Sequence, residues 1–184
     1  MSDEMFIEHC SPTLAGLKTG NMFSCRYASM EEIRDDLRRI NRALRPKGLC
    51  ALPLRFMKDK VLIYLFRPSK LDEDLKNHEA ARLLADEGYE QIGRNRCLTE
   101  LIRRMGTQED FPHEVGLFLS YPPEDVRGFI ENKASGCKLT GTWKVYGDED
   151  GARQKFELYR RCTDSYRKQW AKGKSLRDLA VPCC

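Results

Sequence analysis

The chain has 184 residues, of which 33% are charged, and its 32 lysine and arginine residues exceed its 28 acidic residues for a formal net charge of +4. A chain of this length buries roughly 70% of its unfolded surface in one domain, so it needs neither disulfides nor a metal in order to fold. The small positive excess falls short of the concentrated charge of a dedicated nucleic-acid-binding protein. We therefore expect one globular domain over residues 1–180 and a mobile tail at 181–184.

The N-terminus predicts a cytoplasmic protein without a membrane segment. Met1-Ser2-Asp3-Glu4 is acidic and leads into no apolar signal region, and no later apolar run approaches the roughly 20 residues of a membrane-spanning helix. Eight cysteines could form disulfides in an exported protein. Without an export signal, we expect them to be reduced thiols.

The first third of the chain alternates helix and strand signals. Residues 3–10 favour a helix, and we expect the chain to break at Ser11, because Ser11 as N-cap and Pro12 at the first helical position would start a new helix. A short strand is predicted at 22–27. Ser29 and Glu32 have capping-box spacing, which predicts a helix that ends at Pro46.

A hairpin and two helices follow in the middle of the chain. Residues 49–57 and 60–66 favour two strands, and Pro53 places the first of them at a sheet edge or in a bulge. A helix is expected from Ser69 to Gly88, and another after Asn95 that ends at Gly106.

Residues 111–162 carry the clearest signals for where elements begin and end. The apolar run 115–119 has strand length, the prolines and acids at 121–125 suit a helix first turn, and 142–146 alternates like a second strand. Asp148 can cap a last long helix that ends at Gly173. The whole pattern predicts an α/β (or α+β) fold, a single-domain mixed sheet of about five strands flanked by helices.

Cys10 is the most interesting thiol. If Ser11-Pro12 opens a helix, the Cys10 sulfur lies near a helix N-terminus with His9 adjacent, and both features favour a reactive thiolate. If the helix is continuous, Cys10 shares a face with Phe6 and becomes a buried, inert thiol. A thiol-dependent enzyme, or a redox or metal-handling protein, would use Cys10 as a catalytic residue with His113 as its partner.

The metal and nucleotide signals are weak. His113-Glu114 begins like a zinc-protease motif, but the second histidine is missing, and Gly16 to Gly20 fails the phosphate-loop pattern. The internal cysteines lie in different predicted elements without ligand spacing, so they are more typical of packing residues than of a metal centre. We predict no metal site.

A crevice at two strand ends is the favoured binding site. If the strands near Val115 and Thr142 are parallel, their C-terminal ends open onto loops where open α/β sheets bind ligands. The predicted ligand-binding residues there are Tyr121, Lys144, Tyr146 and Asp148. Against a bound phosphate, Glu124, Asp125 and Asp148 already satisfy the adjoining helix N-termini.

The last long helix is rich in lysine and arginine, which invites a nucleic-acid interpretation. Its arginines alternate with acids at helical spacing, so much of the charge is paired. Its aromatic residues Tyr159, Tyr166 and Trp170 fall on the core face, where they cannot stack on bases. Nucleic-acid binding is therefore not expected.

Four segments carry a family resemblance: HCSPTLAGLK (9–18), FPHEVG (111–116), SYPPEDV (120–126) and GTWKVYGD (141–148). Together they make the chain similar, over nearly its whole length, to a bacterial family known as domain of unknown function 3793, which brings no established activity. Ser120 stands where the family pattern leads us to expect glycine, a change that alters the freedom of that loop. The leading hypothesis is an accessory module that binds a small molecule or a protein at the Tyr121 crevice; it names no cofactor.

Overall fold

The structure is a computed structural model that describes residues 1–90, 93–107 and 111–182. The chain forms two compact units: unit 1 comprises Met1–Ser69 and Arg161–Cys184, and unit 2 comprises Lys70–Arg160. The expectation of a single domain over 1–180 stays a prediction. In the described part of the chain, no helix has the length and apolar character needed to cross a bilayer.

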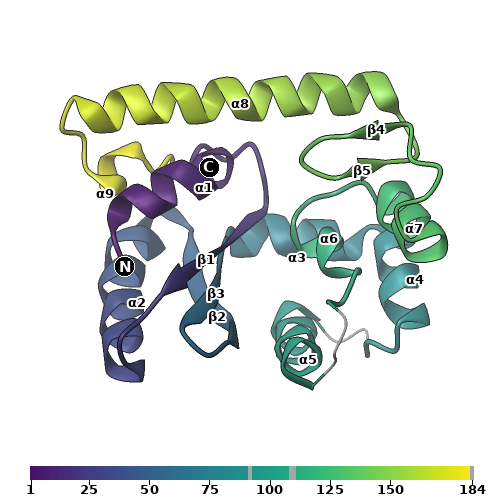
Figure 1. Ribbon diagram of the computed structural model, residues 1–184, viewed down its shortest axis with the longest axis horizontal. Helices are drawn as coiled ribbons and strands as arrows, with labels where there is room; N and C mark the ends of the chain where they lie inside the picture. Colours follow the sequence, from purple (N-terminus) through teal and green to yellow (C-terminus); the bar gives the residue numbers. More distant parts are fainter. Residues whose placement is uncertain (91–92, 108–110, 183–184) are drawn as a thin grey trace. The chain divides into compact units, whose positions relative to one another are not determined.

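The elements are labelled in Figure 1. Unit 1 contains α1 (Asp3–Leu14), β1 (Gly20–Arg26), α2 (Met30–Leu44), the 3₁₀ helix η1 (Arg45–Lys47), β2 (Cys50–Phe56), β3 (Lys60–Phe66) and α9 (Leu176–Leu179). Unit 2 contains α4 (His78–Asp86), α5 (Gly93–Thr107), α6 (Val115–Phe118), α7 (Pro123–Asn132), β4 (Leu139–Thr140) and β5 (Lys144–Val145). Two helices are divided between the units: α3 (Pro68–Lys76) begins in unit 1 and continues in unit 2, and α8 (Glu149–Ala171) begins in unit 2 and continues in unit 1.

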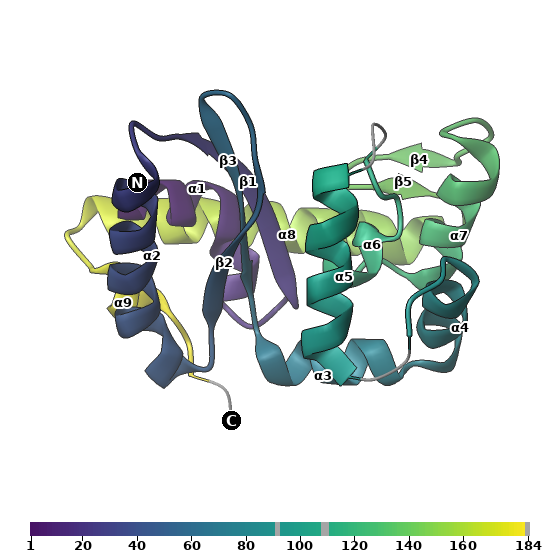
Figure 2. The ribbon, with the colours of Figure 1, turned by 90° about the horizontal axis from the view of Figure 1, so that it is seen from below.

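The core of unit 1 lies on one face of a three-stranded antiparallel sheet with the order β1-β3-β2. Phe23, Ile63 and Ala51 come from the three strands and belong to one buried cluster with apolar residues of α1, α2 and α9. Figure 2 shows these helices beside the sheet. Strand alternation thus selects the residues that face the helices.

Helix α2 shows why the sequence predicts this unit well. Ser29 caps the helix by accepting the Glu32 N–H at 3.1 Å, and the Glu32 carboxylate accepts the Ala28 N–H at 2.7 Å. Ile33, Leu37, Ile40 and Leu44 form the buried stripe. The predicted helix is confirmed, and so are the strand at 22–27 and the hairpin.

Strand β2 lies at a sheet edge and carries a register shift between Pro53 and Arg55, as its proline predicts. The Asn41 side chain covers part of this edge: its Nδ2 donates to the Ala51 carbonyl at 2.8 Å, and its Oδ1 accepts the Ala51 N–H at 2.8 Å. These backbone groups therefore point away from β3. Pro53 lies two residues on, on the same outer side, and has no N–H to donate.

The expected break at Ser11 is wrong, because α1 continues through Pro12 to Leu14. Residues 10–14 are all buried, and this packing compensates for the hydrogen bond that proline removes. The Ser11 hydroxyl donates to the Ile7 carbonyl one turn earlier. The helix ends at Leu14 with Ala15 as its C-cap, and Gly16 follows with a φ of 78°.

A buried arginine holds the end of α1. Arg67 follows β3 and is only 1% exposed. Its Nε donates to the Thr13 carbonyl at 2.7 Å, and its Nη2 donates to the carbonyls of Leu14 and Val181, both at 2.7 Å. The Arg67 cation thus donates to two carbonyls at the C-terminal end of α1. The bond to the Val181 carbonyl fixes the first residue of the tail that we expected to be mobile. Residues 183–184 of that tail lie outside the described residues.

Unit 2 departs more from the predictions. The helix expected from Ser69 to Gly88 is two helices, α3 and α4, because the Asn77 side chain caps α4 by accepting the N–H groups of Glu79 and Ala80 at 3.0 and 3.2 Å. The strand expected at 115–119 is the short helix α6, whose four residues are all buried. A short apolar run is compatible with a strand or with a buried helix, and here it forms a buried helix.

The five strands do not form one sheet. In the described part of the chain they form a three-stranded sheet and a separate two-stranded sheet, in which β4 and β5 pair antiparallel. The mixed helix and strand character is confirmed, but the five-stranded sheet is wrong. The two parallel strand ends that predicted a crevice are therefore absent from this region, because α6 replaces one strand and β5 pairs only with β4.

Candidate functional site

Asp125 organises the part of unit 2 in which the predicted ligand residues lie. It sits in the first turn of α7 and is 2% exposed. Its Oδ1 accepts the backbone N–H groups of Tyr146 and Gly147 at 2.7 and 2.8 Å, and its Oδ2 accepts the indole N–H of Trp143 at 2.7 Å. One carboxylate therefore fixes the segment that follows β4 against α7.

Aromatic rings pack over this segment. Trp143 stacks on Tyr121 at a centroid distance of 5.0 Å and meets the edge of Phe156 at 4.5 Å. The Tyr121 hydroxyl donates to the Thr142 carbonyl at 3.2 Å. Burial, with the nearby Tyr159 adding to it, raises the pKa of Tyr121 to about 12, so its phenol stays neutral at physiological pH.

Two cavities share the wall formed by Tyr121, Asp125 and Trp143. The first, of about 350 Å³, is mostly apolar and is lined by Phe111, His113, Val115, Gly116, Tyr121, Asp125, Val126, Phe129, Trp143 and Lys144. The second, of about 330 Å³, is more polar, and Asp74, Asn77, Glu124, Asp148 and Lys155 are among the residues that line it. We call them the aromatic cavity and the polar cavity.

Gly116 makes room at the shared wall. A Cβ at this position would lie 2.7 Å from the Val126 Cγ2 atom and 3.0 Å from the Tyr121 ring. Ser120, next to Tyr121, has a φ of 58°, the left-handed conformation that glycine adopts most readily. The glycine expected from the family pattern would fit this backbone.

The four predicted ligand residues occupy different places. Tyr121 lines both cavities, Lys144 lines the aromatic cavity and Asp148 lines the polar cavity. Asp148 also caps α8, since its Oδ1 accepts the Gly151 N–H at 3.0 Å. Tyr146 has another position: its ring packs against Gly128 of α7. The strand-end argument that selected these residues is wrong, although three of them do line cavities.

His113 also lines the aromatic cavity, where its ring meets the edge of Phe129 at 4.8 Å. Its neighbour Glu114 is buried and accepts the Tyr89 hydroxyl at 2.9 Å, and Arg104 Nη1 lies 3.6 Å from the same carboxylate. Arg104 also lies over the Tyr89 ring, 4.5 Å from its centroid. Glu114 thus belongs to a buried structural network.

Cys10 lacks the features of a reactive thiol. It lies inside α1, eight residues into the helix, and is 0% exposed. Burial raises the pKa of the Cys10 thiol, and the nearby Lys18 opposes this only in part. Cys10 belongs to unit 1 and His113 to unit 2. The geometry therefore favours the packing interpretation of Cys10 and offers the thiol-enzyme hypothesis no support.

The cysteines at positions 10, 25, 50, 97, 137 and 162 are free thiols. Burial raises the pKa of Cys25, Cys97 and Cys162 as well, the last to about 11. Among residues 1–90, 93–107 and 111–182, no group of three histidine, cysteine or acidic side chains is arranged to hold a metal ion.

Several residues of the site carry no clear signal in the sequence. Asp125 looks like an ordinary acid in a helix first turn, and Trp143 like one inward residue of a strand. Phe129 matches the apolar stripe of its helix. Only the short spacing of aromatic residues, acids and prolines between 121 and 129 could have drawn attention to Asp125 and Phe129.

A family model described as a protein of unknown function, DUF3793, matches residues 6–180. The match covers nearly the entire chain, so the chain belongs to this family, and the resemblance found in the sequence is confirmed. No curated protein and no solved structure matches it.

Proposed function

We propose that the aromatic cavity of unit 2 binds a small, largely apolar molecule that carries one anionic group. The observation that supports this most directly is the cavity itself. Its volume of about 350 Å³ lies in the range of small-molecule sites, and half of its lining residues carry aromatic rings. Its cationic group is Lys144, which selects an anion over a neutral or cationic ligand.

The polar groups of the cavity have distinct roles. The Asp125 carboxylate already accepts three N–H donors, so it shapes the wall instead of binding a ligand. The Lys144 ammonium group donates to the Thr140 hydroxyl at 3.1 Å in an exposed position, and a ligand anion can replace or add to that bond. The His113 ring, which also lines the cavity, can add a hydrogen bond to the ligand. Tyr121, Phe129 and Trp143 contact the apolar body of the ligand.

Two probes of equal shape test this assignment. Naphthoate and naphthamide share an aromatic body and differ in charge. We expect naphthoate to bind the wild-type protein saturably in isothermal titration calorimetry, and to bind more tightly than naphthamide. Lys144→Met should remove this preference while leaving the weaker apolar binding.

The matched control is Lys155→Met. Lys155 is an exposed lysine of the same unit and lines the polar cavity. This variant should keep the preference for naphthoate. Absence of saturable naphthoate binding, or an unchanged preference in a folded Lys144→Met protein, would contradict the assignment.

A further inference from the structure

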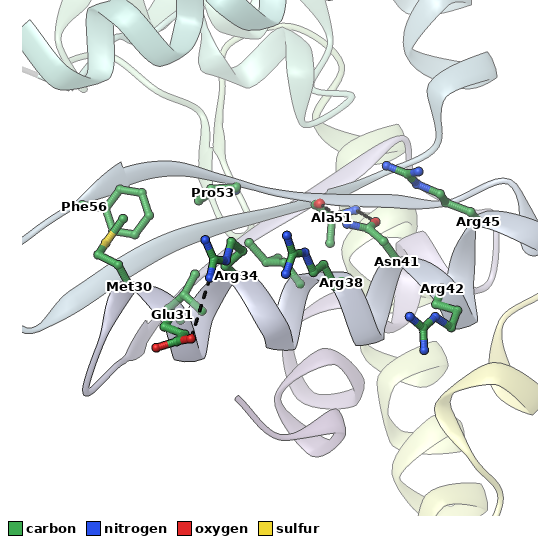
Figure 3. Close-up of a pocket in the computed structure, with 12 residues that line it drawn as sticks. Met30, Glu31, Arg34, Arg38, Asn41, Arg42, Arg45, Ala51, Pro53 and Phe56 are labelled. Atoms are coloured by element: carbon green, nitrogen blue, oxygen red, sulfur yellow. Dashed lines mark hydrogen bonds and ion pairs between the residues drawn. The ribbon is translucent and has the colours of Figure 1, made fainter.

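A second surface lies in unit 1, in an open groove of about 1200 Å³ between α2 and the edge strand β2. Its apolar floor includes Ile33, Leu37, Ala51 and Pro53, and Met30 and Phe56 close one end. Met30 is 57% exposed and Phe56 is 41% exposed. Figure 3 shows Met30 lying against Phe56 at this end of the groove.

Arginines line the helix side of the groove. Arg34, Arg38, Arg42 and Arg45 contribute four positive charges, and Glu31 is the acid that lines it with them. Figure 3 shows Arg34 and Arg38 on the side of α2 toward the strand, with Arg45 near the far end and Arg42 turned away. The groove therefore combines an apolar floor with a cationic rim.

These cations are only weakly neutralised. Arg34 lies 3.8 Å from Glu31, and Arg38 lies 3.2 Å from Asp35. The side chains of both arginines and both acids are more than half exposed. Exposed pairs of this kind are easily exchanged for other partners. Within the described residues, no ion pair involves Arg45. The rim can therefore accept anionic groups from another molecule.

We propose that this groove binds an acidic amphipathic helix of a partner protein. An added strand is disfavoured, because the Asn41 side chain occupies the outward backbone groups of Ala51 and Pro53 offers no N–H. Nucleic acid is disfavoured as well, because the floor is aliphatic and a single aromatic ring, Phe56, lines the groove at one end, so successive bases would have no row of rings to stack on.

The arginine spacing fits a helical partner. Arg34, Arg38 and Arg45 are separated by four and seven residues, or about 6 and 10 Å along a helix. Acids at the same spacing share one face of a partner helix, beside an apolar stripe that would cover Met30 and Phe56. These two exposed apolar side chains supply the apolar contact, and the charges supply orientation and selectivity.

A labelled peptide tests the proposal. The probe is a synthetic helix with glutamates at four- and seven-residue spacing beside a leucine stripe, and fluorescence anisotropy measures its binding to the full chain. We expect saturable binding, and a loss of at least tenfold in affinity for a peptide of the same composition with the pattern scrambled. Equal binding of both peptides would overturn the proposal, because charge alone would then explain it.

Two triple variants with the same charge change separate the groove from general electrostatics. Arg34→Gln/Arg38→Gln/Arg45→Gln should weaken probe binding at least tenfold, whereas Lys168→Gln/Lys172→Gln/Lys174→Gln, which changes exposed lysines elsewhere in unit 1, should weaken it less than threefold. Circular dichroism checks that both variants fold. Similar losses in the two variants would overturn the proposal.

Two further measurements complete the test. Met30→Gln alters the apolar end of the groove at an exposed position, and it should also weaken binding of the peptide probe several-fold. A single-stranded oligothymidylate carrying the same charge as the probe should bind less tightly. Oligothymidylate binding that equals or exceeds that of the peptide and depends on the same arginines would overturn the protein assignment in favour of nucleic acid.

Discussion

Each unit contains a buried charged side chain that bonds several backbone groups, a cation in unit 1 and an anion in unit 2. In unit 1, Arg67 gathers three carbonyl oxygens, at the end of α1 and at Val181. In unit 2, Asp125 gathers two backbone N–H groups and the Trp143 indole N–H. Arg67 joins elements that already pack on a large core, whereas Asp125 holds a segment whose sheet has only two residues per strand.

This difference shows which interactions stabilise the backbone of each unit. The sheet of unit 1 has seven-residue strands with backbone ladders on both sides of β3, so we expect most of the unit to stay folded without Arg67. The segment around β5 has few ladder bonds, and a buried carboxylate replaces them. The aromatic cavity therefore depends on Asp125 more than the groove of unit 1 depends on Arg67.

The largest expected effect is that of Asp125→Ala. It leaves three N–H donors without their acceptor in a buried site, and the free energy of unfolding should fall by about 4 kcal/mol. Asp125→Asn keeps an acceptor and should lose about half as much. Urea unfolding followed by circular dichroism measures both. A loss below about 1 kcal/mol for Asp125→Ala would show that this carboxylate does not organise the segment.

Arg67→Met should lower the free energy of unfolding by about 3 kcal/mol, because the carbonyls of Thr13, Leu14 and Val181 lose the charged donor that joins them. Arg67→Lys keeps the charge but cannot reach three carbonyls with one planar group, so an intermediate loss is expected. Naphthoate binding should survive in Arg67→Lys. A greater loss of stability for Arg67→Met than for Asp125→Ala would reverse the comparison between the units.

Lys18 is another buried charged residue of unit 1, 2% exposed, in the turn after α1. Burial lowers the pKa of Lys18 from 10.5 to about 8. Between these two values the unfolded chain binds more protons, so stability due to this group rises with pH. Relative to Lys18→Met, wild-type protein should gain about 2 to 3 kcal/mol from pH 8 to pH 10.5. Unfolding curves at several pH values measure this slope, and parallel pH profiles of the two proteins would contradict it.

The smallest effect is expected at the surface. Hydrogen bonds from Arg103 and then Arg104 lower the pKa of Glu100 from 4.5 to about 2. The stability from this group is present above pH 4.5 and is lost as the pH falls toward 2. Because the bonds to Arg103 are exposed to solvent and only the bond to Arg104 is partly buried, Glu100→Gln should cost only about 0.5 to 1 kcal/mol at neutral pH and almost nothing near pH 2. An equal cost at both pH values would mean that charge is not the cause.

The sequence predicted unit 1 well where the signals were local. Ser29 and Glu32 set the start of α2, and Pro53 marked the edge strand with its bulge. The same local reasoning failed at Pro12, because burial of α1 outweighed the missing N–H. It also failed at Val115, since a short apolar run carries no information about the partners that bury it.

The site could be predicted only in part. Tyr121 and Lys144 were selected by an argument about parallel strands that the structure overturns, yet both line the aromatic cavity. Trp143 and Phe129 match the apolar faces of a strand and a helix, so the sequence gives no reason to place them in a site, and both form part of its wall. No local pattern could show that Asp125 lies under the segment after β4, because that contact joins residues 18 to 22 positions apart.

The most direct test of the proposed function uses the two tryptophans of the chain. Trp143 lines the aromatic cavity, whereas Trp170 packs against the core of unit 1. In ¹H–¹⁵N correlation spectra, each indole N–H gives its own signal, so Trp170 serves as an internal reference. Naphthoate should shift the Trp143 signal saturably and leave the Trp170 signal in place. If neither signal moves, or if both move together, the aromatic cavity is not the binding site.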